Sequence, residues 1–146
     1  MPSLDGATEW MNADGFDPKT LDGSPVLIHF WAVSCHICHE VMAEVVSYYD
    51  VYKDQGLKMV GVHMPKQESD TDTIKVKKDI ATYQIKQPIA IDNMHRITDA
   101  FDNQFVPAFF LFDKEGKLFY RAAGDKGFAN VKPKIEQLLG ISDSQS

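Results

Sequence analysis

The sequence has few cysteines, no excess of positive charge and no long apolar run, and each shortage excludes a class of protein. Two cysteines among 146 residues cannot form the disulfide framework of a small secreted domain. The 21 acidic residues outnumber the 15 lysines and arginines, so neither nucleic acid nor an anionic membrane finds a positive surface to bind. The apolar run from residue 26 to residue 33 is interrupted by His29 and is too short to cross a bilayer. We therefore expect no nucleic-acid partner and no membrane association.

The length and an ordinary composition, 44% hydrophobic and 25% charged, predict a single domain. We divide it into an N-terminal extension over residues 1–24, a core over residues 25–140 and a flexible tail over residues 141–146. The first residues contain no basic stretch followed by an apolar one, which is the pattern of a secretory signal. We therefore expect a cytoplasmic protein, and we expect it to be a monomer.

Segments typical of strands and helices alternate along the core. Residues 26–32 are apolar, β-branched and aromatic, which indicates a buried strand. Residues 36–53 contain neither Gly nor Pro and repeat apolar side chains at helical spacing, which predicts a long helix ended by Gly56. Further strands are expected at residues 9–12, 58–64, 88–91, 108–112 and 118–123, and further helices at residues 73–83, 96–101 and 129–139. This order predicts an α/β fold in which a central mixed β-sheet carries helices on both faces.

The two cysteines stand at the junction between the first buried strand and the long helix. Cys35 follows the strand directly, and Cys38 falls in the first turn of the helix. A thiol at a helix N-terminus faces unpaired N–H groups and the positive end of the helix dipole, so its pKa falls below the usual value of about 8.5. The thiolate is the nucleophile in thiol–disulfide exchange. We therefore expect Cys35 to attack a disulfide and Cys38 to resolve the mixed disulfide that forms.

One segment resembles the active-site segment of the thioredoxin-like superfamily: Phe30-Trp31-Ala32-x-x-Cys35-x-x-Cys38. The chain length and the strand–helix insertion between Pro65 and Ile91 resemble the TlpA/ResA-like branch, an insertion that peroxiredoxin-like proteins share. Within that branch the chain is most similar to the soluble YkuV-type oxidoreductases of Gram-positive bacteria. In those proteins too a His precedes the Phe-Trp pair, a Ser precedes the first Cys and a His follows it. The resemblance runs from about Pro25 to Leu139.

This resemblance implies a thioredoxin fold and thiol–disulfide exchange with protein substrates that carry a dithiol or a disulfide. It also implies an upstream thiol reductant, and no cofactor besides the redox-active Cys35–Cys38 disulfide. In the cytoplasm we expect the net direction to be reduction. Val106-Pro107 is similar to the family's substrate-binding loop, in which the proline follows a cis peptide bond. By analogy, Trp31 shields the site, Val106 offers its backbone to an extended substrate strand, and Pro107 keeps the loop against the sulfurs.

Three features depart from the thioredoxin pattern. Ser34 stands where the family usually has Trp, and His36-Ile37 replaces Gly-Pro between the cysteines. His29 replaces the buried acid of the first core strand, and Gly61 aligns with the Lys partner of that acid. Substrate preference, reduction potential and the group that transfers protons therefore do not follow from the resemblance.

Two of the five histidines are candidates for a role beside the cysteines. His29, inside an apolar strand, is either a core histidine satisfied by a backbone partner or the acceptor of the Cys38 proton. His36 is either simply exposed or carries a positive charge beside the Cys35 thiolate, which would make the disulfide more oxidising. No role is assigned to the other three, of which the first is expected on a helix surface: His39, His63 and His95.

Four other functions compete with thiol–disulfide exchange. The stretch from Cys35 to His39 also spells Cys-x-x-Cys-His, the attachment motif of c-type haem, although that attachment normally occurs outside the cytoplasm. A peroxiredoxin-like thiol peroxidase fits the length and the inserted segment, but the Pro and Thr that precede its reactive Cys are absent. A non-enzymatic binding domain has no need of both cysteines. A structural zinc site needs four ligands, and no second Cys or His pair has the right spacing, so we expect no metal.

Overall fold

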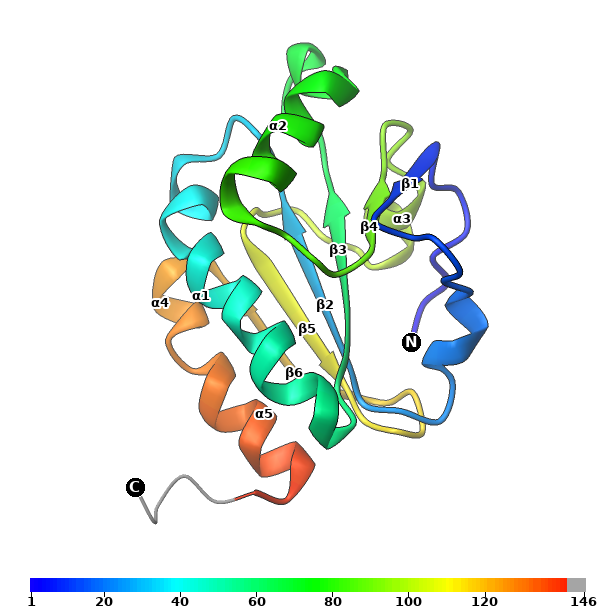
Figure 1. Cartoon of the computed structure of the whole chain (residues 1–146), viewed down its shortest axis with the longest axis vertical. Helices are drawn as coiled ribbons and strands as arrows, with labels where there is room; N and C mark the ends of the chain where they lie inside the picture. Colours follow the sequence, from blue (N-terminus) through cyan, green and yellow to red (C-terminus); the bar gives the residue numbers. More distant parts are fainter. Residues whose placement is uncertain (142–146) are drawn as a thin grey trace.

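The structure is a computed structural model that describes residues 1–141. A mixed sheet forms its centre, with six strands in the order β1-β4-β3-β2-β5-β6 (Figure 1). The strands are β1 (Glu9–Met11), β2 (Val26–Trp31), β3 (Lys58–His63), β4 (Ile89–Ile91), β5 (Ala108–Phe112) and β6 (Leu118–Ala123). β2, β3 and β4 are parallel to one another, whereas β1, β5 and β6 pair antiparallel with their neighbours. The predicted mixed sheet is thereby confirmed.

Helices cover both faces of the sheet. They are α1 (His36–Tyr52), α2 (Thr73–Tyr83), α3 (Arg96–Ala100), α4 (Gly124–Phe128) and α5 (Val131–Leu139), with the 3-10 turns η1 (Pro18–Leu21), η2 (Lys53–Gln55) and η3 (Glu68–Thr71). The parallel pairs need crossover connections, which α1 supplies between β2 and β3, and η3 with α2 between β3 and β4. α1, α4 and α5 lie together on one face, and α3 lies on the other (Figure 1). Among residues 1–141, no helix has the length and apolar character to span a membrane.

Side chains along β2 alternate between two hydrophobic clusters, one on each face of the sheet. Leu27 and Trp31 join the cluster under α1, whereas Ile28 and Phe30 join the cluster on the opposite face. His29 lies between them in the sequence and shares the face of Leu27 and Trp31, because successive side chains of a strand point to opposite faces. The strand is therefore buried on both sides, and its one polar residue faces α1.

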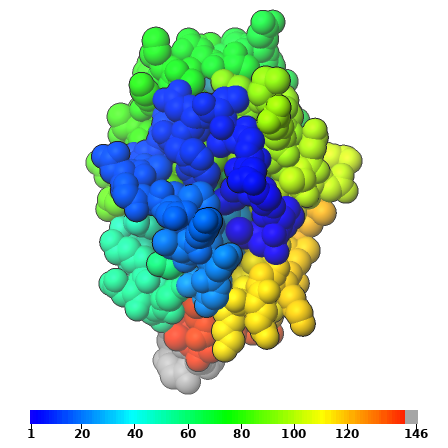
Figure 2. Space-filling model, turned by 90° about the vertical axis from the view of Figure 1, so that its right-hand side faces the viewer, coloured from blue at the N-terminus to red at the C-terminus, as the bar shows by residue number. Residues whose placement is uncertain are grey.

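The N-terminal segment was predicted to be an extension with a strand at residues 9–12, and that strand is present as β1. Its strand β1 pairs antiparallel with β4, with Trp10 opposite Ala90. Leu4 and Leu21 are buried in the cluster that faces away from α1. The segment is spread over that face of the molecule in Figure 2. It folds back because the apolar cluster beneath it would otherwise be exposed to water.

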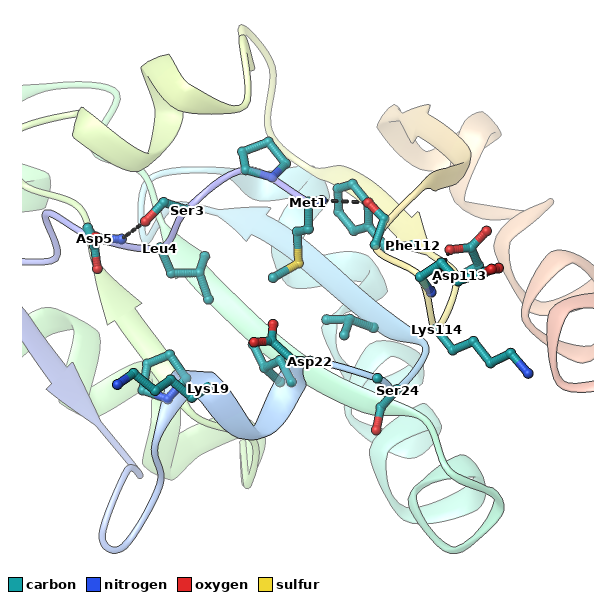
Figure 3. Close-up of a pocket in the computed structure, with 17 residues that line it drawn as sticks. Met1, Ser3, Leu4, Asp5, Lys19, Asp22, Ser24, Phe112, Asp113 and Lys114 are labelled. Atoms are coloured by element: carbon teal, nitrogen blue, oxygen red, sulfur yellow. Dashed lines mark hydrogen bonds between the residues drawn. The ribbon is translucent and has the colours of Figure 1, made fainter.

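The same segment lines a pocket of about 440 Å³ together with the turn between β5 and β6 (Figure 3). The Met1 amino group donates a hydrogen bond across it to the Gly116 carbonyl. Val26 and Phe112 also line this pocket. Because Val26 begins β2 and Cys35 follows the end of β2, the pocket and the cysteines lie at opposite ends of that strand.

The C-terminal part differs from the sequence prediction in two details. The stretch that forms α4 was not predicted as a helix, and α5 begins at Val131, two residues later than expected. Two glycines in α4 indicate a turn by propensity, but Phe128 packs against Phe109 and is buried, and this contact favours the helix. Residues 142–146, most of the predicted tail, lie outside the described residues.

Candidate active site

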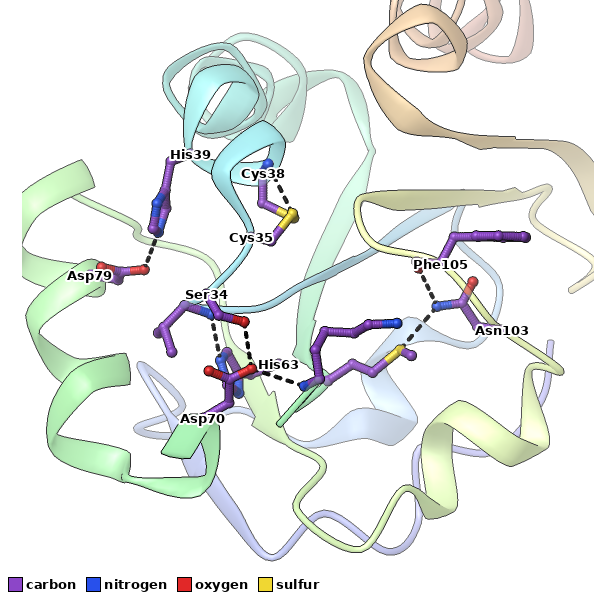
Figure 4. The surroundings of a disulfide bond; sticks show 12 residues. Ser34, Cys35, Cys38, His39, His63, Asp70, Asp79, Asn103 and Phe105 are labelled. Atoms are coloured by element: carbon purple, nitrogen blue, oxygen red, sulfur yellow. Dashed lines mark hydrogen bonds and ion pairs between the residues drawn. A yellow bond between two sulfur atoms is a disulfide. The ribbon is translucent and has the colours of Figure 1, made fainter. Parts of the chain in front are cut away.

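Cys35 and Cys38 lie where β2 leads into α1 (Figure 4). The two sulfurs form a disulfide bond. Cys35 is the N-cap of α1, and its Sγ accepts a hydrogen bond from the Cys38 N–H at 3.1 Å. Cys35 is partly exposed, whereas Cys38 is 1% exposed. Of the two sulfurs, that of Cys35 is therefore the one that another molecule can reach.

The start of α1 favours a negative charge on Cys35 Sγ, the more exposed of the two sulfurs. The first N–H groups of a helix have no partner within the helix, and one of them, on Cys38, already points at Cys35 Sγ. No acidic residue occupies the first turn, where a negative charge would oppose a thiolate. The surroundings of Cys35 Sγ thus favour a negative charge there.

His29 lies below the active-site helix. Its side chain and that of Cys38 line one narrow pocket with Pro107 and Phe109, and this pocket has no room for a water molecule. Its Nε2 lies 2.9 Å from the side-chain amide nitrogen of Gln87, so the hydrogen-bond partner is a side chain and not a backbone group. Burial lowers the pKa of His29 to about 3, because a charged ring is disfavoured away from water. The ring is therefore neutral at neutral pH.

Two buried residues without a role in the sequence analysis hold the segment that leads to Cys35. The Val33 N–H donates a hydrogen bond to His63, and the Ser34 hydroxyl donates one to Asp70. These contacts depend on the register of β2 against β3 and on the fold of the polar loop after β3. The spacing of residues in the sequence carries no signal for either.

The loop before β5 approaches the cysteines from the other side. The Val106–Pro107 peptide bond is cis, and Pro107 lines the pocket beneath Cys38. The buried side chain of Asn103 donates a hydrogen bond to the Phe105 carbonyl at 2.8 Å (Figure 4). Asn103, which the sequence analysis did not single out, therefore holds the loop just ahead of Val106.

Two histidines of α1 each follow one of the cysteines, His36 after Cys35 and His39 after Cys38. His36 is exposed, and its Nε2 lies 3.5 Å from a carboxylate oxygen of Glu40. His39 contacts the Asp79 carboxylate of α2 at 2.6 Å and stacks on Tyr83. His39 was expected on the helix surface and is only 27% exposed, because α2 covers part of this side of α1. In the part of the chain that the structure describes, no group of three or more His, Cys, Asp or Glu side chains could hold a metal ion.

Residues 9–121, which include both cysteines and the loop before β5, match the AhpC/TSA family. The chain belongs to the AhpC/TSA family. The thiol–disulfide oxidoreductase YkuV of Bacillus subtilis is 42% identical over 143 residues, covering 98% of this chain and 96% of YkuV. The thiol–disulfide oxidoreductase ResA of Bacillus cereus is 30% identical over 121 residues, covering 83% of this chain and 65% of ResA. A solved thioredoxin-like protein in its oxidized form has a TM-score of 0.87 at 42% identity, covering 96% of this chain and 94% of that one.

This member of the AhpC/TSA family is a thiol–disulfide oxidoreductase with a thioredoxin-like fold. The Cys35–Cys38 disulfide at the start of α1 is the redox pair that this activity requires. The resemblance to the TlpA/ResA-like branch and to its YkuV-type members is confirmed as well.

In this AhpC/TSA protein, Gly61→Ala is expected to displace His29 and destabilise the fold. Gly61 pairs with His29 across β2 and β3, and a Cβ there would lie 2.8 Å from His29 Nε2 and 2.6 Å from Ile89 Cδ1. Overpacking of this kind destabilises a core by about 1–3 kcal/mol. Urea unfolding measures the loss, and NMR follows the His29 ring signal. A variant with the parental free energy of unfolding and an unmoved ring signal would contradict the expectation.

Proposed function

We propose that this protein reduces disulfide bonds in protein substrates and is recharged by an upstream thiol reductant. The unequal exposure of Cys35 and Cys38 carries the proposal. The Cys35 thiolate attacks one sulfur of the substrate disulfide, whose other sulfur leaves as a thiolate. Cys38 then attacks Cys35 and displaces the first substrate sulfur, so two electrons pass to the substrate and the Cys35–Cys38 disulfide forms. Two thiols of the reductant restore the dithiol.

The direction of exchange in this proposal depends on the compartment. We place the protein in the cytoplasm as a monomer, where glutathione and thioredoxin systems keep thiols reduced. A dithiol recharged there donates electrons to substrate disulfides.

An extended substrate strand would dock beside the disulfide. The Phe105 carbonyl is already engaged within the protein, so Val106 is the next residue whose backbone could pair with a substrate. Pro107 would keep this loop against the sulfurs, and the buried Trp31 would shield them from beneath. His36, exposed next to Cys35, would meet the substrate on the helix side.

His29 is the proton acceptor in this scheme. Cys38 must lose its proton in apolar surroundings before it can attack, and the neutral ring of His29 lines the same pocket. A 180° flip of the Gln87 side-chain amide would exchange its nitrogen and oxygen. Oε1, which has no hydrogen-bond partner, would then lie against His29 Nε2. The ring would then carry its proton on Nε2, and Nδ1 would be the basic nitrogen. In this scheme the proton would pass between the two side chains of this narrow pocket.

We expect His29→Ala to slow the resolving step while the attack by Cys35 keeps nearly its parental rate. A positioned base contributes about 10²-fold, and less when its pKa lies far below the working pH, so release of the mixed disulfide should slow by up to about that factor. Acid quenching of the reaction between the reduced protein and a disulfide-bonded protein substrate measures both steps. Failure of the reduced parent to reduce any such substrate would overturn the proposed function itself.

A cavity control separates the proton transfer from packing. Met42→Ala opens the same pocket but keeps His29, so it should lose stability and still resolve the mixed disulfide at the parental rate. Urea unfolding of both variants checks that each is folded. A stable His29→Ala variant that resolves as fast as the parent would make His29 a core histidine only.

The alternative functions would require features that this site does not have. Attachment of c-type haem would need Cys38, which is 1% exposed, to reach the porphyrin. His39 would have to leave Asp79 and Tyr83 to bind iron. For a peroxidase, the segment before Cys35 lacks the Pro and Thr that accompany the reactive cysteine.

A further inference from the structure

Val33 and Ser34 connect the end of β2 to Cys35, and two side chains hold them (Figure 4). The Val33 N–H donates a hydrogen bond to Nε2 of His63 at 3.0 Å. The Ser34 hydroxyl donates one to Oδ2 of Asp70 at 2.7 Å. Both contacts therefore end within two residues of the nucleophile.

Asp70 is a carboxylate built into the interior of the protein. It belongs to η3 and is 1% exposed, and the oxygen that binds Ser34 also accepts the Lys66 N–H at 2.9 Å. Burying a carboxylate is unfavourable unless hydrogen bonds offset the loss of water. Through these two bonds Asp70 ties the loop after β3 to the loop after β2.

His63 is constrained as closely. It ends β3 in register with Trp31, and the two rings pack edge-on with their centroids 4.9 Å apart. Burial lowers the pKa of His63 to about 4, an effect that the nearby charge of Asp70 opposes. The ring is thus neutral near pH 7, and a neutral ring nitrogen can accept the Val33 N–H. A charged ring would carry a proton on both nitrogens and could not.

We propose that Asp70 and His63 are positioning residues of the exchange reaction, because they fix the backbone that carries Cys35. With Val33 and Ser34 held, Cys35 Sγ stays next to the N–H groups at the start of α1. A released segment would let the sulfur leave that position, and less of it would be thiolate at a given pH. The inference rests on the proposed role of Cys35 as the nucleophile.

Ser34→Ala tests the inference because it removes one tether and replaces no titratable side chain. The charged groups that share a pocket with Ser34 are Asp70 of η3 and Lys75, Lys78 and Asp79 of α2. The other titratable groups on the elements next to Cys35 are His36, His39 and Glu40 of α1 and His63 of β3. We expect the midpoint pH for alkylation of Cys35 in the reduced protein to rise by about 0.5 to 1, a three- to tenfold slower reaction below the midpoint. Ser34→Thr keeps the hydroxyl and should restore the parental profile. Ser69→Ala, at an exposed position of η3, should leave the profile unchanged.

A pair of variants at His63 separates the hydrogen bond from packing. His63→Leu lacks an acceptor and should shift the alkylation profile as Ser34→Ala does, whereas His63→Gln keeps one and should stay near the parent. Urea unfolding shows which variants are folded. Parental alkylation profiles in folded Ser34→Ala and His63→Leu would overturn the inference. Failure of Cys38→Ser to trap a substrate would instead overturn the proposed function, because the alkylation profile needs no substrate.

Discussion

Cys38→Ser will accumulate a mixed disulfide with a protein substrate, and Cys35→Ser will accumulate none. Cys35 is partly exposed and caps α1, so it can attack without Cys38 but cannot then be displaced. Cys35→Ser retains only a sulfur that is 1% exposed, and its turnover should fall to the uncatalysed background. Non-reducing electrophoresis after mixing with a disulfide-bonded substrate measures the trapped complex, and a thiol assay measures turnover.

Because the chain has so few cysteines, the trapping experiment has an unambiguous result. The chain has two cysteines, so each variant retains a single thiol and a trapped complex identifies the sulfur that formed it. The double variant Cys35→Ser, Cys38→Ser is the matched control and should trap nothing. Equal trapping by the two single variants, or trapping through Cys38 alone, would reverse the assigned roles.

Acidification from pH 7 to pH 4 will strongly destabilise the fold through two buried histidines. Burial lowers the pKa of His29 to about 3 and that of His63 to about 4, whereas both take the ordinary value of 6.5 in the unfolded chain. Their contribution to stability is therefore fully present above pH 6.5. As the pH falls below that value the unfolded chain binds protons that the folded protein does not, and the free energy of unfolding falls.

The slope of that loss identifies its source. Each histidine contributes about 1.4 kcal/mol per pH unit between pH 6 and pH 4, on the order of 3 kcal/mol at pH 4. Urea unfolding at a series of pH values measures the slope, and the double variant His29→Gln, His63→Gln should reduce it. His36→Gln is the control, because the His36 side chain is 88% exposed. A double variant that loses stability as steeply as the parent would assign the effect to other groups.

The sequence predicts those features that depend on local pattern. The apolar stretch before Cys35 and the uninterrupted helix after it locate the disulfide at a strand–helix junction. The two-residue period of a strand is enough to place His29 on the face of Trp31. Gly56 ends the helical turn after α1 with a positive φ, as its position indicates.

The missed features depend on contacts between distant segments. Trp31 lies opposite His63 because of the register between the parallel strands β2 and β3. The alternation of side chains along each strand does not determine that register. Gln87 reaches His29 from the loop before β4, 58 residues away in the sequence. Asp70 lies in a polar stretch that resembles a solvated loop, yet η3 turns its side chain inward. The N-terminal segment likewise contains too few apolar residues to reveal that it completes the core.

The pairing of β1 with β4 also bears on self-association. Ile89–Ile91 is a short, wholly buried strand, and its outer edge is hydrogen-bonded by the N-terminal segment, including a bond from the Thr8 N–H to the Ile91 carbonyl at 2.8 Å. An open strand edge is a template on which another chain can add a strand, which is a common route to aggregation. β1 therefore covers a strand edge on which another chain could otherwise pair. A chain shortened to residues 25–140 would expose the edge of β4, and its copies could pair with one another through that edge.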